Sequence, residues 1–335
     1  MLLAATFLIL SMALIVASSE LFTNGIEWLG QRLNLNEGVV GSVLAAIGTA
    51  LPETLVPLVA IVSFGSEQGN EVSVGAITGS PFMLSTLTLG LCGIFVYVFH
   101  KRGLRPLELK LDYRVLKRDL RFFLLAFSLA YLACFSPADP LLRRGLGAMI
   151  FLLYPVYIYF TLKADGSVGE EPGPLYLARF GGGSNSSNLA LILMQVGLSV
   201  LGIGIGAYYF VDRIQDVSQM LGFPPQVLSI MISPIATEFP EKMNSILWLR
   251  RGKDTLALGN VTGALVFQGT ILGGFGVACT QWNLGSDAKI GAAVAIVSGI
   301  ITLIMVSKEK LSFRYLSLGA LVYLACILLF QFNKM

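Results

Sequence analysis

The chain has 335 residues, of which 55% are hydrophobic and only 13% are charged, and its formal net charge is +3. Soluble globular domains carry about 25% charged residues, so this composition excludes an ordinary soluble protein. The apolar residues lie in long blocks, and a helix needs roughly 20 mainly apolar residues to cross a bilayer. We therefore predict an all-α polytopic membrane protein.

Ten apolar segments follow one another along the chain, each near the length that crosses a bilayer. The first lacks a basic start and a clear small-residue cleavage site, so we interpret it as a spanning helix and not as a signal peptide. We expect helices over residues 2–29, 38–64, 71–99, 120–137, 144–163, 188–217, 223–250, 255–280, 289–306 and 313–332.

Three connections are basic: residues 100–119, 250–254 and 308–314. With ten spans they lie on one face, and the positive-inside rule makes that face cytoplasmic. Both termini are then outside a plasma (inner) membrane. Residues 164–187 are rich in Gly, Ser and Asn, which predicts a flexible cytoplasmic linker.

Several function classes lack the residues that they need. The four cysteines are isolated and the chain has one histidine, so a disulfide framework, a thiolate metal site and histidine-based catalysis are not expected. A nucleophile–base pair or metal triad for an intramembrane enzyme is not visible either. We expect no cofactor and no nucleic-acid partner. The expected partners are lipid and inorganic cations, and a monomer and a homodimer both remain open.

An internal repeat divides the chain. G-T-A-L-P-E at 48–53 aligns with A-T-E-F-P-E at 236–241, at an offset of 188 residues (241 − 53). S-V-G-A-I-T-G-S at 73–80 aligns with A-L-G-N-V-T-G-A at 257–264, at an offset of 184 (257 − 73). Each half holds five spans, and because five is odd the second half is inverted. We predict two inverted five-helix repeats, 1–163 and 188–335 with the linker between them, a plan typical of secondary transporters with an ion site at the midplane.

Acidic residues lie inside two of the predicted spans: Glu53, Glu238 and Glu241. An acid in hydrocarbon costs roughly 2.5–3.5 kcal/mol on insertion scales, so it normally faces a partner or a cavity. These three carboxylates are therefore candidate cation ligands, since hard cations prefer oxygen ligands.

Two prolines at repeat-equivalent positions add backbone ligands. Pro52 cannot donate to the carbonyl of Gly48, and Pro240 cannot donate to that of Ala236. A single proline would predict only a packing kink. Two at equivalent positions, each after a threonine and before a glutamate, favour an oxygen cage for a cation such as Ca²⁺ or Na⁺.

The paired motifs resemble those of the cation/calcium antiporter superfamily, which contains the sodium/calcium exchangers. The resemblance implies a carrier whose signature helices supply Thr, Ser and Glu to the ions. The positions of this sequence that match the family's ligand pattern are Thr49, Glu53, Ser80, Thr237 and Glu241. The chain departs from the family pattern at Ala50, Leu84 and Ala264, which lack the usual oxygen, and at Glu238 and Gln268. With the two carbonyls, the candidate ligands are Glu53, Glu241, Thr49, Thr237, Glu238, Ser80, Gln268, Gly48 and Ala236.

The resemblance implies a secondary active antiporter that exchanges a divalent cation, Ca²⁺ in the first place, for Na⁺ or H⁺ by alternating access. Coupling to protons needs fewer dedicated oxygens than loading several sodium ions, because a desolvated glutamate can titrate near neutral pH. Another divalent cation such as Mg²⁺ remains an alternative. A cation channel is an alternative of another class, but it needs a continuous pore.

Lys242 stands four residues after Glu238, on the same face of the predicted helix. One interpretation is an intramembrane ion pair that neutralises Glu238. The other is a tethered ammonium that competes with an ion for the cage. Elsewhere, the sequence G-I-G-I-G at 202–206 predicts a close helix contact. Polar residues of the first and sixth predicted spans either line the ion path or are solvated: Glu20, Asn24, Glu27, Asp212, Arg213 and Asp216.

Overall fold

The computed structural model of the protein describes residues 2–32, 45–65, 67–136, 139–163, 173–180 and 188–332. Over these residues the chain forms helices and no strand. They are α1 (Leu2–Arg32), α3 (Ala45–Phe64), α4 (Glu67–Met83), η2 (Leu84–Thr88), α5 (Leu89–Lys101), α6 (Tyr113–Ala133), α7 (Pro140–Lys163), α8 (Tyr176–Phe180), α9 (Leu189–Leu221), α10 (Pro225–Arg250), α11 (Asp254–Phe267), η3 (Gln268–Leu272), α12 (Gly273–Cys279), α13 (Ser286–Ser307) and α14 (Phe313–Phe332).

Helices lie in every predicted segment, although the start of the second segment, 38–44, lies outside the described residues. Among the described helices, seven stretches are long and apolar enough to cross a membrane. Helix α6 begins seven residues before the predicted start (120 − 113), because the Asp112 side chain accepts a hydrogen bond from the Arg114 backbone N–H. This N-cap satisfies a backbone donor that the first turn leaves unpaired.

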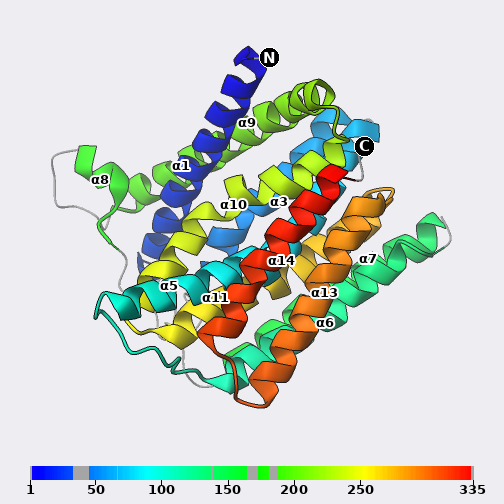
Figure 1. The fold of residues 1–335 in the computed structure, drawn as a ribbon. Helices are drawn as coiled ribbons and strands as arrows, with labels where there is room; N and C mark the ends of the chain where they lie inside the picture. The colour runs from blue at the N-terminus through cyan, green and yellow to red at the C-terminus, as the bar shows by residue number, and fades with distance from the viewer. Residues whose placement is uncertain are drawn as a thin grey trace.

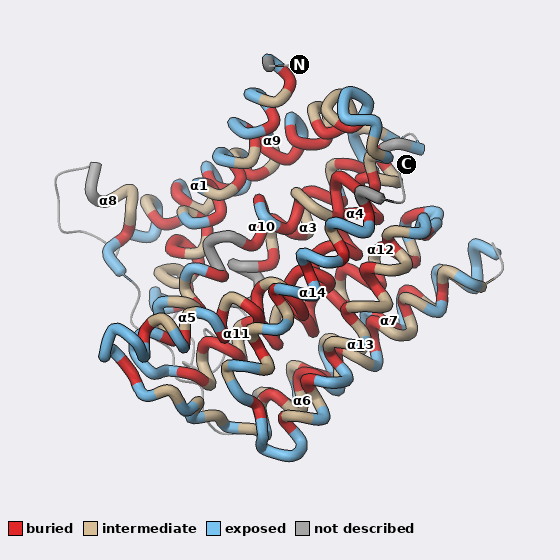
Figure 2. Tube along the Cα trace, viewed as in Figure 1, coloured by how far each residue is buried: buried red, intermediate tan, exposed pale blue. Residues whose placement is uncertain are grey.

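Large apolar side chains cover the outside of the helix bundle. Figure 2 shows buried residues concentrated in α4, α10 and α12, and many exposed residues on α7, α9 and α14. The exposed side chains include Leu152, Leu193, Leu201, Leu321 and Leu324. A soluble protein rarely exposes so much contiguous apolar surface, so this face fits a lipid environment and confirms an integral membrane protein.

The two longest described helices, α1 and α9, pack side by side (Figure 1). Glycines allow the close approach: a Cβ built on Gly206 would lie 2.8 Å from Ile15, and one on Gly202 would clash with Ser18. The close helix contact that the G-I-G-I-G sequence predicts is therefore confirmed. Small residues at such crossings let helix backbones approach in membranes.

A second close crossing joins α4 to α10. A Cβ on Gly79 would lie 2.6 Å from the carbonyl oxygen of Ile230, so only glycine fits there. The Ser229 hydroxyl of α10 donates to the Val72 carbonyl of α4 over 2.8 Å. This crossing holds the segment that contains Ser80 against α10.

Two π-helical turns, η2 and η3, interrupt the long helices that contain α4–α5 and α11–α12. They begin at Leu84 and Gln268, which are 184 residues apart. In a π-turn a backbone N–H donates to the carbonyl five residues back, and not to the carbonyl four residues back as in an α-helix. The Thr270 hydroxyl donates to the Val266 carbonyl over 2.6 Å, and the Thr86 hydroxyl donates to the Phe82 carbonyl in the same way. Equivalent hydroxyls thus hydrogen-bond to the helix backbone at both turns.

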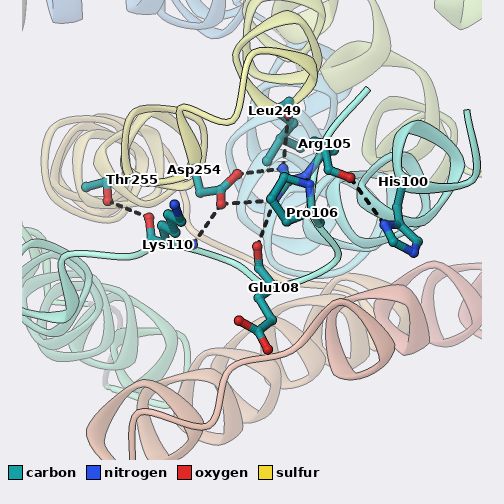
Figure 3. A network of polar contacts seen from close by, with 8 residues as sticks. All are labelled: His100, Arg105, Pro106, Glu108, Lys110, Leu249, Asp254 and Thr255. Atoms are coloured by element: carbon teal, nitrogen blue, oxygen red, sulfur yellow. Dashed lines mark hydrogen bonds and ion pairs between the residues drawn. The ribbon is translucent and has the colours of Figure 1, made fainter. Parts of the chain in front are cut away.

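The basic connections gather at one end of the bundle. Arg105 forms a bidentate pair with Asp254, with nitrogen–oxygen distances of 2.6 and 2.9 Å, and it also donates to the Leu249 carbonyl (Figure 3). The Tyr113 hydroxyl donates to the Glu309 carbonyl over 3.2 Å. The prediction that these three connections share one face is confirmed.

Part of the predicted linker is structured. The described residues 173–180 include α8, and the Tyr176 hydroxyl donates to Glu20 Oε1 of α1 over 2.8 Å. Gln195 of α9 accepts from the Leu177 backbone N–H over 2.9 Å and donates to Asn24 over 3.0 Å. Residues 173–180 therefore differ from the expected flexible linker, because polar side chains of α1 and α9 bind their backbone.

Candidate functional site

One amide joins two buried acids from different helices. Gln268 Nε2 donates to Glu53 Oε2 of α3 and to Glu238 Oε1 of α10, each over 3.0 Å. Glu53 is 4% exposed, and Glu238 and Gln268 are fully buried. The two hydrogens of one NH₂ group are thus shared between two carboxylates in the interior of the bundle.

The π-turn η3 carries the amide. Gln268 is its first residue, and the wide turn alters the helical register at that point. Its Oε1 atom is buried and has no hydrogen-bond partner among the described residues. A buried carbonyl oxygen without a partner is costly, and here it lies on the same amide group that contacts both acids.

Lys242 approaches the site from α10 itself. Its Nζ lies 2.7 Å from Glu238 Oε2 and 3.4 Å from the carbonyl oxygen of Pro234. The contact with Glu238 is an ion pair and not a well-aligned hydrogen bond, because the Oε2 atom has no donor in a hydrogen-bonding geometry. The predicted ion pair at this i, i+4 spacing is confirmed.

The other predicted ligands divide into two groups. Ser80, Ala236 and Thr237 are buried, and the Thr237 hydroxyl donates to the Ser233 carbonyl of its own helix over 3.2 Å. Gly48, Thr49 and Glu241 lie in α3 and α10, but their side-chain placement lies outside what the structure describes. Among the side chains that are described, no three His, Cys, Asp or Glu residues gather into a metal-binding group.

Sequence reasoning missed one buried polar cluster next to the second signature segment. Asp119 of α6 accepts from the Thr262 hydroxyl over 2.8 Å and from the Tyr157 hydroxyl over 3.1 Å. Thr262 is the threonine of the G-N-V-T-G-A segment. The sequence shows Asp119 only as an acid at the edge of an apolar segment. Its two partners could not be identified from sequence, because they are 143 and 38 residues away.

This arrangement is suited to cations. Carboxylate and amide oxygens are the ligands that hard cations prefer. An amide has a donor end and an acceptor end, so Gln268 can satisfy the two acids with its NH₂ group or offer its oxygen to an ion. Acids buried inside an apolar helix bundle mark a candidate ion site, so the fold and this site fit a membrane cation transporter.

Comparison with known proteins specifies the family. The family described as sodium/calcium exchanger protein matches residues 3–163 and 191–333. The chain belongs to this exchanger family.

Relatives and solved structures agree. Sodium/calcium exchanger MaX1 of Methanosarcina acetivorans is 24% identical over 292 residues, which cover 77% of each chain. The match to the structure of H⁺/Ca²⁺ exchanger CAX has a TM-score of 0.73 at 18% identity, and it covers 99% of this chain and 88% of that chain. The match to the structure of the sodium-calcium exchanger NCX_Mj has a TM-score of 0.59 at 22% identity, and it covers 97% of this chain and 98% of that chain. At these identities the two structures establish the fold alone.

Proposed function

We propose that the protein is a secondary active antiporter that exchanges a divalent cation, Ca²⁺ in the first place, for H⁺ or Na⁺. The observation that carries this proposal is the shared contact of Gln268 with Glu53 and Glu238. Two acids from different helices, buried and joined by one amide, form a compact set of oxygen atoms with enough negative charge for one divalent ion.

The amide supplies a way to load the site. When no cation is bound, the NH₂ group of Gln268 stabilises one oxygen of each acid. When a cation enters, rotation of the amide turns its Oε1 atom toward the ion and releases both carboxylate oxygens. We assign Glu241, Thr49, Thr237, Ser80 and the carbonyls of Gly48 and Ala236 to the remaining ligand positions.

The packing supports two inverted five-helix repeats in ten spans. In two inverted repeats, α5 of the first half corresponds to α12 of the second, and α7 corresponds to α14. The contact between α5 and α14 then corresponds to the contact between α12 and α7, and the structure contains both contacts. The π-turns η2 and η3 also occur at equivalent positions. In such a plan the ion site lies at the midplane, between the repeats.

We further propose that the repeats span 1–163 and 188–335, joined by the linker 164–187. The face with the basic connections is cytoplasmic, since the positive-inside rule favours it. Both termini then lie outside a plasma (inner) membrane. The transport cycle needs no cofactor beyond the exchanged ions.

Uptake of radioactive Ca²⁺ into proteoliposomes tests the proposal, with an outward-directed gradient of H⁺ or of Na⁺. An antiporter accumulates Ca²⁺ under at least one gradient, whereas a channel only equilibrates it. Glu53→Gln should abolish uptake, while Glu309→Gln, which changes an exposed acid far from the site, should leave it unchanged. Normal uptake by Glu53→Gln would refute the site, and no gradient-driven uptake of Ca²⁺ or Mg²⁺ would refute the function.

A further inference from the structure

We infer that the Lys242 ammonium occupies the place of a monovalent coupling cation beside Glu238, and that an incoming divalent cation displaces it. The inference rests on the proposed function and makes Lys242 a specificity-determining residue of that site. The alternative is a permanent ion pair that only stabilises the fold.

The surroundings of the ammonium resemble those of a small bound cation. Nζ lies 2.7 Å from the Glu238 carboxylate, 3.4 Å from the Pro234 carbonyl oxygen and 4.0 Å from Met83 Sδ. Carboxylate and carbonyl oxygens are the ligands of hard monovalent and divalent cations. The Lys242 side chain is about nine-tenths buried and Glu238 is fully buried, so the contact lies away from solvent.

The acid and the base enter the sequence together. At the repeat offset of 188, Glu238 and Lys242 fall on Ala50 and Thr54, which are neutral. There the Thr54 hydroxyl donates to the Ala50 carbonyl over 2.7 Å, a local contact with no charge. The second half thus carries one additional acid with one additional cation, and the summed charge of the two helices at these positions is unchanged.

The geometry of the contact is compatible with exchange. A permanent buried ion pair requires good geometry and further hydrogen bonds to offset desolvation. Here Glu238 Oε2 lacks an aligned donor, while Oε1 is held by Gln268. The long, flexible lysine stem allows the ammonium to withdraw.

The expected consequence is competition at one carboxylate. While Lys242 contacts Glu238, the ammonium neutralises one carboxylate of the site. The site then has less negative charge to offer, so it binds a divalent cation more weakly. When the divalent cation leaves, the ammonium returns and keeps the buried acid neutralised. The carrier can then change conformation without a free monovalent ion at this position, since an unpaired charge in the membrane interior is expensive.

Ca²⁺ binding to the purified full-length protein tests this inference, with NaCl compared with choline chloride at equal ionic strength. Lys242→Met should raise Ca²⁺ affinity about tenfold or more in choline, because it removes a competing positive charge. Na⁺ should then compete with Ca²⁺ and raise the melting temperature of this variant. Lys242→Arg is the matched control, and it should resist Na⁺ as the wild type does.

Removing both charges provides a second control. Glu238→Ser combined with Lys242→Thr should bind Ca²⁺ more weakly, because one proposed carboxylate ligand is lost, and should show no response to Na⁺ at this position. Wild-type affinity of Lys242→Met in both salts would contradict the inference and favour a permanent structural pair. If Lys242→Met folds only when extracted in NaCl, the inference is supported, and failure to fold in either salt contradicts it.

The test separates this inference from the proposed function. If the wild type neither binds nor transports a divalent cation, the proposed function fails. The stabilisation of Lys242→Met by Na⁺ still decides whether the ammonium fills a monovalent-cation position. If the wild type transports Ca²⁺ but Lys242→Met shows no effect of Na⁺, only the inference fails.

Discussion

Gln268 contacts acids that lie 215 and 30 residues away in the sequence. Its amide holds Glu53 of the first half and Glu238 of the second in one arrangement. In the first half, Leu84 occupies the repeat-equivalent position and is buried. At this repeat position the second half has an amide and the first half has an apolar side chain, which makes Gln268 the sharper target for mutation.

We predict that Gln268→Met reduces Ca²⁺ uptake at least about tenfold, because it removes the shared donor and a proposed oxygen ligand, each worth about 1–3 kcal/mol to charged partners. Uptake into proteoliposomes and Ca²⁺ binding measure the effect. Leu84→Met is the matched control, and volume-conserving apolar changes of this kind usually cost less than about 1.5 kcal/mol. Equal losses in both variants would show that packing, and not the amide, is responsible.

The candidate site could be predicted in part. An acid inside an apolar run is conspicuous, so Glu53 and Glu238 are evident from sequence, and the spacing of Lys242 predicts its ion pair. The bridge through Gln268 could not be predicted, since it depends on helices that meet only in three dimensions. The family pattern singled out position 268, but the contacts it makes required the structure.

At the scale of elements, the π-turns were not predictable from periodicity. A single π-turn adds little to a helical pattern, because the flanking residues keep the 3.6-residue repeat. One signal was present: Thr86 and Thr270 occupy repeat-equivalent positions. Their hydroxyls donate to backbone carbonyls four residues back, so both π-turns carry the same side-chain hydrogen bond to the helix backbone.

We predict that Thr270→Val destabilises the protein by about 0.5–1.5 kcal/mol, because the hydrogen bond from the Thr270 hydroxyl to the Val266 carbonyl is lost. It should also reduce Ca²⁺ uptake, since η3 positions Gln268. Thr86→Val should cost similar stability but leave more uptake, because Leu84 begins its turn. Thermal melting in detergent and vesicle uptake measure the two effects. A greater loss of uptake in Thr86→Val would contradict this account.

A second prediction at this scale concerns the loop between α5 and α6. Arg105→Ala leaves Asp254 buried without its bidentate partner, and breaking such a pair costs about 3–5 kcal/mol. A marked fall in melting temperature is expected. Lys117→Ala breaks the more exposed pair with Glu309 and should cost no more than about 1 kcal/mol. Similar falls in the two variants would show that the Arg105 network is not a structural clamp.

At the scale of the whole molecule, hydropathy predicted where helices lie, because the bilayer demands long apolar segments. It misplaced the start of α6, whose first turns are polar and are fixed by a cap at Asp112. It also missed α8, since five residues in a polar segment carry no periodic signal. Contacts with α1 and α9, and not local sequence, hold that helix.

We predict that α1 and α9 move as one body during transport, because their glycine-lined interface is close and continuous. In a background without native cysteines, a disulfide between Ser18→Cys and Gly202→Cys should leave Ca²⁺ uptake within about twofold of the reduced protein. The two positions face each other across the helix crossing, since a Cβ on Gly202 would lie 3.1 Å from that of Ser18. A disulfide needs about 3.5–4.5 Å between the Cβ atoms, so the helices must separate slightly to form it.

A link between α3 and α9 is the contrasting control. Phe64 and Tyr208 have ring centroids 5.1 Å apart, and cysteines at both positions joined by a short bismaleimide should block uptake. Loss of uptake on oxidising the α1–α9 pair, with normal uptake after the α3–α9 link, would reverse the assignment of the moving part.

The difference between Leu84 and Gln268 has an energetic consequence. Two identical inverted halves would make the inward-open and outward-open forms equivalent by a two-fold rotation, with equal energies and equal ion affinities. Here the amide and the ammonium both belong to the second half. In the proposed antiporter the two forms are then unequal even in a symmetric bilayer, and we expect a preferred resting orientation set by the protein's own side chains.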